Sequence, residues 1–278
     1  MENLFDLTGK TALITGGGGL LGEKHAEAIL EYGGNVVLAD YDENRAIKKS
    51  KKLNDTYGEN RAVGCYIDVT DVESINLACD SIEKIDILIN NAAKNPKVQK
   101  DSENEWFSVI NNNRFESMPH SYFSEGLEVT LNGNFLMSQA VVTKMLKDNH
   151  GGVILNIASD LGVIAPDQRI YKKDNDEDWE TQDVKPIFYS AAKFAVIGMT
   201  KYLSTYLAEK NIRVNSLSPG GVYDNHPDDF VTKVTNLIPL SRMANVDEYK
   251  GAVVFACSDA SSYMTGHNLI VDGGRTAW

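Results

Sequence analysis

The chain has 278 residues, of which 42% are hydrophobic and 24% are charged. Those fractions are typical of a globular protein and exclude a disordered or fibrous chain. Its 27 Lys and Arg against 39 Asp and Glu leave a formal net charge of −12. Because nucleic-acid binding depends on clustered basic residues, we expect no nucleic-acid partner.

Membrane insertion, secretion and metal binding are not indicated. The apolar run 252–257 is far shorter than the roughly 20 residues that a membrane-spanning helix needs. The N-terminal residues are acidic where a signal peptide is basic. Cys65, Cys79 and Cys257 are widely spaced, which is typical of reduced thiols and indicates a cytoplasmic protein. The histidines lack the spacing of a metal site, so no metal is expected.

Short β-rich apolar runs alternate with helical patterns along the chain. The runs that predict strands are Thr11–Thr15, Asn35–Asp40, Arg61–Asp68, Ile85–Ala93, Gly152–Ser159, Ile212–Leu217 and Asn268–Asp272. Several lack polar alternation, as expected of parallel strands covered on both faces. Helical spacing in Leu21–Tyr32 and Phe188–Glu209 predicts crossover helices. We therefore expect one α/β domain over 1–278, with a doubly wound parallel sheet of about seven strands and helices on both faces.

Two segments interrupt this alternation, near 94–123 and 160–185. Segments of this length in a compact domain are typically functional lids or mobile insertions, and the alternative is a solvated surface excursion. The second contains the acidic cluster 174–178, which we interpret as solvated charge in preference to a set of metal ligands.

A glycine-rich segment, Thr15–Gly22, follows the first predicted strand and opens a helix. Glycines there allow a tight turn and close approach to a pyrophosphate at the helix N-terminus. Asp40 ends the second strand, 18 residues after Gly22, where a carboxylate binds the ribose hydroxyls of NAD and repels the 2′-phosphate of NADP. Arg45 is expected inside the next helix, and the alternative role for Asp40 is a helix cap or a surface turn. We therefore predict NAD as the cofactor.

Tyr189 and Lys193 are four residues apart, which places them on one face of a helix. A free tyrosine has a pKa of about 10 and is a weak base at neutral pH. A nearby ammonium favours the phenolate, so we expect the pKa of Tyr189 to be lowered towards a useful range. Alone, this pattern also fits an ordinary helix surface.

Taken together, the motifs resemble those of the short-chain dehydrogenase/reductase (SDR) family over nearly the whole chain, in its short, single-domain, Rossmann-like branch. The matching segments are the glycine loop, Asp68-Val69, Asn90–Ala93, Ser159 at the end of a strand, the Tyr189/Lys193 pair, Asn215 with Ser218–Gly221, and Asp272–Gly274.

The resemblance implies hydride transfer between the nicotinamide of NAD and a secondary alcohol or ketone. Tyr189 would be the general acid/base, Ser159 would hydrogen-bond the substrate oxygen, and Lys193 would bind the nicotinamide ribose and tune Tyr189. Val222 would contact the carboxamide through its backbone. Tyr189 and Lys193 also count among the cofactor-binding residues, together with Gly16, Gly19, Leu21, Asp40, Asp68, Val69, Asn91 and Val222.

Two features depart from the family pattern. The glycines fall one, four and seven residues after Thr15, as in longer SDRs that act on nucleotide sugars, whereas the short branch would have its second glycine at Leu20. The family's helix-four asparagine aligns with Thr130. Asn132 is near, but two residues along a helix point in nearly opposite directions. Either Thr130 replaces that asparagine in the proton relay or the relay follows another route.

The interval from Ser159 to Tyr189 is long and polar, which favours a sugar or activated sugar as substrate. Its candidate contacts are Arg169, Tyr171, Lys172, Lys173 and Trp179, with Tyr223, Asn225 and His226 beyond the sixth strand. Two segments, 91–96 and the C-terminal 271–278, also resemble the corresponding segments of SDRs from surface-sugar and flagellin-modification pathways. That narrower resemblance implies a nonulosonic or nucleotide-activated sugar.

Two other functions stay open at this point. One is a catalytically silent NAD-binding scaffold or redox sensor, and the other is an epimerase or dehydratase that retains NAD. The family resemblance also implies a homotetramer, built partly on the helix from Lys193 to Glu209. The apolar residues Phe194, Ile197, Tyr202 and Tyr206 fit such an interface and equally fit a core.

Overall fold

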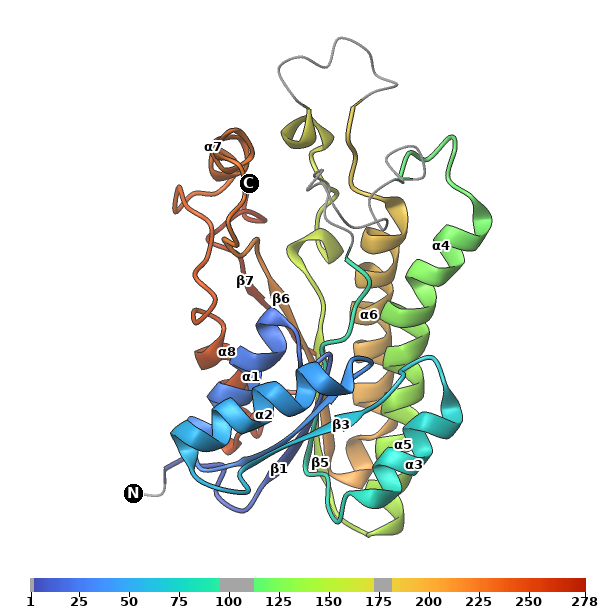
Figure 1. Ribbon diagram of the computed structural model, residues 1–278, viewed down its shortest axis with the longest axis vertical. Coiled ribbons are helices and arrows are strands. Elements are labelled where there is room, and N and C mark those ends of the chain that lie inside the picture. The colour runs from blue at the N-terminus through green and yellow to red at the C-terminus, as the bar shows by residue number, and fades with distance from the viewer. Residues whose placement is uncertain (1–2, 96–112, 173–181) are drawn as a thin grey trace.

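A seven-stranded parallel sheet runs through the molecule in the computed structural model, which describes residues 3–95, 113–172 and 182–278 (Figure 1). The strands are β1 (Thr11–Thr15), β2 (Asn35–Asp40), β3 (Ala62–Tyr66), β4 (Ile87–Asn90), β5 (Gly152–Ile157), β6 (Ile212–Pro219) and β7 (Asn268–Val271). Their order is β3-β2-β1-β4-β5-β6-β7. This is the doubly wound Rossmann-like arrangement that the sequence predicts, and its order reverses between β1 and β4.

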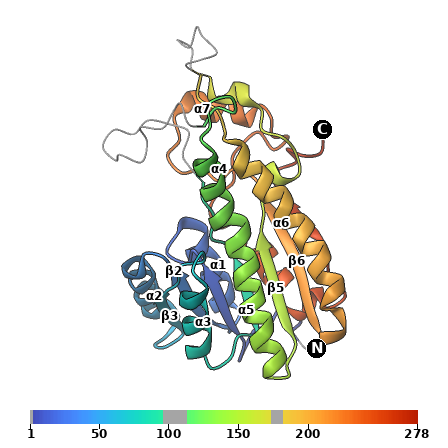
Figure 2. The same ribbon diagram turned by 90° about the vertical axis from the view of Figure 1, so that its right-hand side faces the viewer.

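Helices cover both faces of the sheet. They are α1 (Leu20–Glu31), α2 (Glu43–Tyr57), α3 (Val72–Ser81), α4 (His120–Leu127), α5 (Gly133–Lys147), α6 (Ile187–Tyr206), α7 (Asp228–Thr235) and α8 (Lys250–Cys257). Apolar residues of α1, α2 and α8 form one core with the sheet, and those of α3 and α5 form a second core on the opposite face. Figure 2 shows α5 and α6 side by side along β5 and β6.

The strands form where the sequence is apolar on both faces. Every residue of β4 is buried, and β5 is buried after its first residue, because helices pack on both sides of these central strands. The outer strand β3 is partly exposed, which agrees with its mixed composition. Predicted and observed strands differ only at their ends. The predicted strand 61–68 shortens to β3, whose pairing stops where β2 ends, and 85–93 shortens to β4.

The predicted helix to Glu209 ends earlier. The α6 helix stops at Tyr206, a single 3₁₀ turn covers Ala208–Lys210, and Asn211 adopts a left-handed conformation (φ 54°). Asparagine tolerates that conformation better than most residues, so the chain can reverse into β6.

The two predicted insertions contain ordered elements within the described residues. The α4 helix begins in the last residues of the first and continues beyond it. In the second, the 3₁₀ segments Asp160–Gly162 and Gln168–Tyr171 follow β5. Ile170 is buried against Val234, Ile238 and Met243, so this segment packs on α7 and the chain that follows it. The acidic cluster 174–178 lies outside the described residues.

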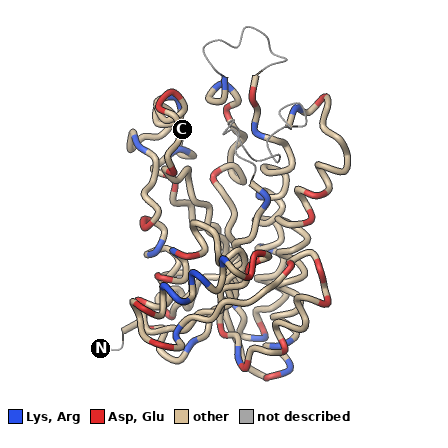
Figure 3. Tube along the Cα trace, in the orientation of Figure 1, with Lys and Arg blue, Asp and Glu red and all other residues tan. Residues whose placement is uncertain are grey.

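No helix within 3–95, 113–172 and 182–278 is both long and apolar enough to cross a membrane. Over the same residues no group of three or more His, Cys, Asp or Glu side chains is placed to hold a metal ion. Blue basic segments are scattered among red acidic ones in the view of Figure 3.

The C-terminal tail returns to the carboxyl ends of the central strands through a buried ion pair. Arg275 Nη1 lies 2.9 Å from Asp160 Oδ2, and the two side chains are 7% and 5% exposed. Asp160 directly follows Ser159, so this pair joins the end of the chain to the segment that leaves β5. Removing one partner of a buried pair leaves the other charge uncompensated, which is costly.

We expect Arg275→Met to lower the free energy of unfolding by about 3 to 5 kcal/mol, because Asp160 is left buried without its cation. The double variant Asp160→Asn/Arg275→Met should recover most of that loss, since no charge is then stranded. Chemical denaturation measures both. Arg169→Met is the matched control, because that side chain is 87% exposed. Equal losses in the single and double variants would contradict the assignment.

Candidate active site

The glycine-rich segment connects β1 to α1 in a tight turn. Gly16 has a φ of 62°, and Gly19 caps α1. A Cβ on Gly22 would lie 2.3 Å from the Gly16 carbonyl oxygen, so only glycine fits there. The first amides of α1, including those of Leu20 and Leu21, have no partner in the preceding turn of the helix. Free N–H groups at a helix N-terminus suit a pyrophosphate, so the residues present fit a dinucleotide.

The end of β4 holds this segment in place. Thr15 Oγ1 accepts hydrogen bonds from the amides of Asn91 and Ala92, each at 3.0 Å. Asn91 Nδ2 donates to the carbonyls of Thr15 and Gly16 at 3.0 and 3.1 Å. Asn91 therefore fixes the glycine turn at the point where the strand order reverses.

Asp40 ends β2 beside the same turn. Its Oδ2 accepts from the Gly18 amide at 2.9 Å, and its Oδ1 accepts from the Asp42 amide at 3.0 Å. Arg45 lies in the first turn of α2, as expected, but its side chain reaches back and donates from Nη2 to the Gly18 carbonyl at 3.0 Å. A carboxylate and a guanidinium therefore both border the place where the ribose of a dinucleotide would lie.

Asp68 and Val69 follow β3. The Asp68 carboxylate accepts from the amide and hydroxyl of Thr70, and Val69 is buried where α5 begins, at Gly133. They border the carboxyl edge of the sheet, on the β3 side of the glycine turn.

Ser159, Tyr189 and Lys193 meet beyond the carboxyl end of β5. Tyr189 lies in the first turn of α6, and Lys193 Nζ lies 5.8 Å from the centre of its ring. Lys193 is buried and donates to the Ile157 carbonyl at 2.6 Å. The Ser159 hydroxyl lies close enough to Tyr189 to lower its pKa, while Ser159 itself donates to Asp160 Oδ1 at 2.9 Å.

Burial controls the charge of both α6 groups. It raises the pKa of Tyr189 to about 12, against the lowering influence of Ser159. Burial, together with repulsion from Lys185, lowers the pKa of Lys193 to about 7. The direction for Tyr189 is opposite to the one we expect from spacing alone, because burial disfavours the phenolate more than the neighbouring groups favour it.

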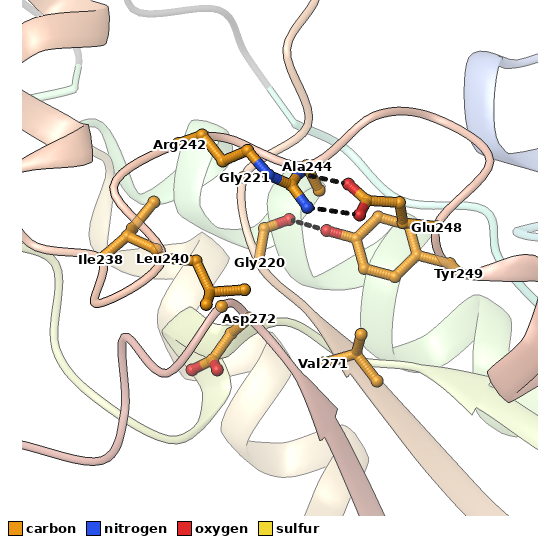
Figure 4. Close-up of a pocket in the computed structure, with 11 residues that line it drawn as sticks. Gly220, Gly221, Ile238, Leu240, Arg242, Ala244, Glu248, Tyr249, Val271 and Asp272 are labelled. Atoms are coloured by element: carbon orange, nitrogen blue, oxygen red, sulfur yellow. Dashed lines mark hydrogen bonds and ion pairs between the residues drawn. The ribbon is translucent and has the colours of Figure 1, made fainter.

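The segment after β6 carries Val222, which forms an isolated parallel bridge with Ala244. Behind it lies a small cavity of about 90 Å³ (Figure 4). There the Tyr249 hydroxyl donates to the Gly220 carbonyl at 2.9 Å, and Arg242 forms a two-bond ion pair with Glu248. These contacts fix the backbone that leads into Val222.

A π-helical turn, Glu128–Asn132, lies between α4 and α5. It contains both candidates for the position of the family's helix-four asparagine, Thr130 and Asn132. Thr130 is buried and its hydroxyl accepts from the Lys94 amide at 3.1 Å, whereas Asn132 is exposed. Thr130 is therefore the inward-facing residue at this position.

A buried amide network lies under the site. Asn90 Nδ2 donates to Asn134, Ser138 and Asn156, and Asn156 Nδ2 donates to Thr200 of α6. The network ties β4 and β5 to α5 and α6.

The predicted substrate contacts divide into three groups. Arg169 is exposed and paired with Asp167. Tyr171, His226 and Tyr223 belong to one chain of ring contacts with centroids 5.2 to 6.4 Å apart, in which Phe230, not a predicted contact, joins Tyr171 to His226. Asn225 lies between Tyr223 and His226 in sequence and has a left-handed conformation. The third group contains Lys172, which is exposed, and Lys173 and Trp179, which lie outside the described residues.

Sequence reasoning missed two cations at the site. Lys185 Nζ lies 4.0 Å from the centre of the Tyr189 ring, and Arg275 pairs with Asp160. Lys185 lies four residues before Tyr189, but Pro186 intervenes at the start of α6, so helical spacing gives no signal for it. Arg275 approaches from the distant end of the chain, and no local pattern reveals that contact.

Two family models match the chain. The one described as "short chain dehydrogenase" matches residues 10–171, and the one described as "Enoyl-(Acyl carrier protein) reductase" matches residues 181–276. Among similar proteins, a trans-4-hydroxycyclohexanecarboxylate dehydrogenase of Sinomonas cyclohexanicum is 34% identical and covers 96% of this chain and 93% of the relative. A D-threitol dehydrogenase of Mycolicibacterium smegmatis is 32% identical, covering 98% and 95%. The post-translational flagellin modification protein A of Campylobacter coli is 30% identical, covering 96% and 98%.

Solved structures agree with the fold over almost the full length. A short-chain dehydrogenase of Leptospira borgpetersenii with bound NAD+ is 32% identical with a TM-score of 0.81, covering 99% of this chain and 96% of that one. A gluconate 5-dehydrogenase of Burkholderia cenocepacia in complex with NADP and tartrate is 27% identical with a TM-score of 0.82, covering 99% and 98%. Together with the sheet order and the motifs, these matches show that the chain belongs to the short-chain dehydrogenase/reductase family and is an oxidoreductase of CH–OH groups.

Proposed function

We propose that this protein is an NAD-dependent oxidoreductase that transfers a hydride between nicotinamide and a secondary alcohol or ketone of a polar, sugar-like compound. The observation that carries the proposal is the meeting of Ser159, Tyr189 and Lys193 at the carboxyl end of β5, near the glycine turn that suits a dinucleotide. When bound, the nicotinamide supplies the hydride acceptor or donor.

Tyr189 is the proposed proton donor and acceptor. Its raised pKa keeps the phenol protonated at neutral pH, which is the form that donates a proton to a carbonyl oxygen during reduction. During oxidation the phenol must first lose its own proton, and the resulting phenolate oxygen takes the proton from the substrate hydroxyl. Ser159 orients the substrate oxygen, and for this its hydroxyl turns from Asp160 Oδ1 towards the substrate. Lys193 holds the nicotinamide ribose and adds positive charge beside the phenol when it is protonated.

The glycine turn and the strand ends form the proposed cofactor site. The free amides at the start of α1, including that of Leu21, bind the pyrophosphate together with the turn at Gly16 and Gly19. Asp40 binds the adenine ribose, and Asp68 with Val69 borders the adenine. Asn91 supports the site through its bonds to the glycine turn, and Val222 presents its backbone to the carboxamide.

Relatives support a polar alcohol as substrate. The names of the similar proteins include a polyol, threitol, and two carboxylate-bearing alcohols, gluconate and hydroxycyclohexanecarboxylate. The similarity to a flagellin-modification protein keeps a nonulosonic or nucleotide-activated sugar within the proposed class. The alternative function, an epimerase or dehydratase that retains NAD, would instead give substrate turnover without net reduction of NAD.

We expect Tyr189→Phe to lower kcat by about 1,000-fold while NADH binding changes little, because the proton-transferring hydroxyl is lost and the ring is kept. NAD reduction measured with a panel of alditols, aldonates and cyclic secondary alcohols tests the rate, and NADH fluorescence tests binding. Tyr263→Phe, a fully exposed tyrosine, is the control. Unchanged turnover in Tyr189→Phe would refute the role, and a wild type that binds NADH but turns over nothing would favour the silent scaffold.

The Asp40→Ala variant should change the cofactor preference. Removing the carboxylate removes repulsion of a 2′-phosphate and leaves Arg45 beside the same place, so the ratio of kcat/KM for NAD to that for NADP should fall by about 10- to 100-fold. Steady-state kinetics with both cofactors measure this ratio. Asp55→Ala, an exposed acid on α2, should leave it unchanged. An unaltered ratio in Asp40→Ala would count against NAD selection by this residue.

We also propose a homotetramer. The outer face of α6 exposes Phe194 (48%), Tyr202 (66%) and Tyr206 (68%), and the last two stack with ring centres 5.9 Å apart. Exposed apolar side chains gathered on one helix are typical of an interface between subunits.

Light scattering should give a mass close to four times 30.6 kDa for the wild type. Phe194→Glu/Tyr206→Glu should reduce the mass to that of a smaller species, because charges placed on this face prevent its burial. Leu77→Glu, which changes an exposed residue of α3, should keep the tetramer. A monomeric wild type would overturn the proposal.

A further inference from the structure

Lys185 faces the proposed catalytic phenol. Its Nζ lies 4.0 Å from the centre of the Tyr189 ring and donates to Asn95 Oδ1 at 2.5 Å. Lys193 lies farther from the same ring, at 5.8 Å, and its Nζ bonds to the Ile157 carbonyl. The two ammonium groups therefore have different surroundings, and the role proposed for Lys193 leaves Lys185 without one.

Lys185 has no anionic partner in direct contact among the described residues. Its two close neighbours, the Asn95 amide and the Tyr189 ring, are both neutral. Asp160 stabilises its charge from a distance, but the Asp160 oxygens already bond to Ser159, Leu161 and Arg275. Burial lowers the pKa of Lys185 to about 8, so most of it is still protonated at neutral pH.

The charge of the site is opposite to that of the protein. The chain has a net charge of −12, yet within the described part of the chain Lys185, Lys193 and Arg275 lie around Tyr189 and Asp160, and Asp160 is in direct contact with Arg275 alone of these three cations. Cations that lack a nearby anion in a partly dehydrated site bind anionic groups strongly, because the charge-assisted bond is not screened by water.

A cavity of about 390 Å³ adjoins Lys185, large enough for a small-molecule substrate. Arg114 and Glu116 also line this cavity and form an ion pair with each other, so Lys185 is the lining cation without a carboxylate in direct contact among the described residues. The remaining polar lining is Asn113, Gln168 and Ser190. The Ser190 hydroxyl is buried and has no hydrogen-bond partner among the described side chains and backbone groups. An unsatisfied buried hydroxyl next to a lysine is a further place for an oxygen-rich ligand to bind.

We propose that Lys185 binds an anionic group of the substrate, and that the substrate is a hydroxy acid whose carboxylate lies on the same small skeleton as the reacting secondary alcohol. This inference rests on the proposed function, because it assumes that the reacting oxygen lies at Tyr189. The phenol oxygen and Lys185 Nζ both lie close to one ring centre, so an oxygen bound to Tyr189 and a carboxylate bound to Lys185 can belong to one molecule. Lys185 is better placed for that carboxylate than Lys193, because its Nζ lies 4.0 Å from the ring centre against 5.8 Å, and Lys193 has the nicotinamide ribose as its proposed partner.

The matched test compares acids with neutral alcohols of the same skeleton. Four- to six-carbon aldonates are paired with the corresponding alditols, and 4-hydroxycyclohexanecarboxylate with 4-(hydroxymethyl)cyclohexanol. For the wild type we expect kcat/KM to be higher for the acid of at least one pair. Lys185→Met should lower kcat/KM for that acid by about 30- to 100-fold, mostly through KM, and should change the value for the neutral partner less than about threefold.

Two further variants separate this role from a structural one. Lys185→Arg should keep the preference for the acid, since it keeps the cation. Lys201→Met removes an exposed lysine of α6, the helix that follows Lys185, and should change neither value. Thermal unfolding of each variant shows whether it folds. A similar loss for acid and neutral alcohol in Lys185→Met would overturn the proposal.

Binding distinguishes failure of this inference from failure of the proposed function. Calorimetric titration of the NADH-saturated enzyme with each acid and alcohol measures affinity without turnover. Tighter binding of the acid that is lost in Lys185→Met supports the inference even where turnover is absent, in which case the proposed reaction is the part that fails. If no acid of the panel binds more tightly than its neutral partner, the inference is overturned.

Discussion

The packing of α6 against β5 is the interaction on which the site depends. Asn156 of β5 donates to Thr200 of α6, and Lys193 donates to the Ile157 carbonyl at the strand's end. These bonds fix how far α6 slides along the strand and how it is rotated. Because Tyr189 lies one helical turn before Lys193, the same bonds place its ring beside Ser159, which leaves β5 two residues after Ile157. Tyr189 and Ser159 are 30 residues apart in the chain and meet only through this contact.

The parallel sheet then brings the remaining groups to the same edge. All strands end on one side, so the glycine turn, Asp40, Asn91 and the segment at Gly220 border one region although they are spread over most of the chain. The reversal of strand order between β1 and β4 opens the crevice there. The strands on either side of that crevice are β1 and β4. Asn91, which follows β4, donates hydrogen bonds to the glycine turn that follows β1, and these bonds fix the shape of the crevice.

Electrostatics at the site reflect dehydration as much as pairing. A tyrosine and two lysines lie together where burial opposes charge, so the pKa of Tyr189 rises and those of Lys185 and Lys193 fall. Asp160 and Arg275, by contrast, form a direct ion pair at 2.9 Å. The pKa values in such a site depend on the bound ligand. An anion at Lys185 would remove part of the repulsion that lowers the pKa of Lys193.

The sequence by itself determined the class of fold, the order of its elements and the main site motifs. Strand patterns such as Asn35–Asp40 are local, and so are the glycine turn and the four-residue spacing of Tyr189 and Lys193, because each depends on neighbours in the chain. Tertiary structure alone decided that Thr130 faces inward, that Arg275 pairs with Asp160, and that Lys185 faces the Tyr189 ring. It also decided the direction of the Tyr189 pKa, since burial depends on every element packed around a group and not on the residues beside it in sequence.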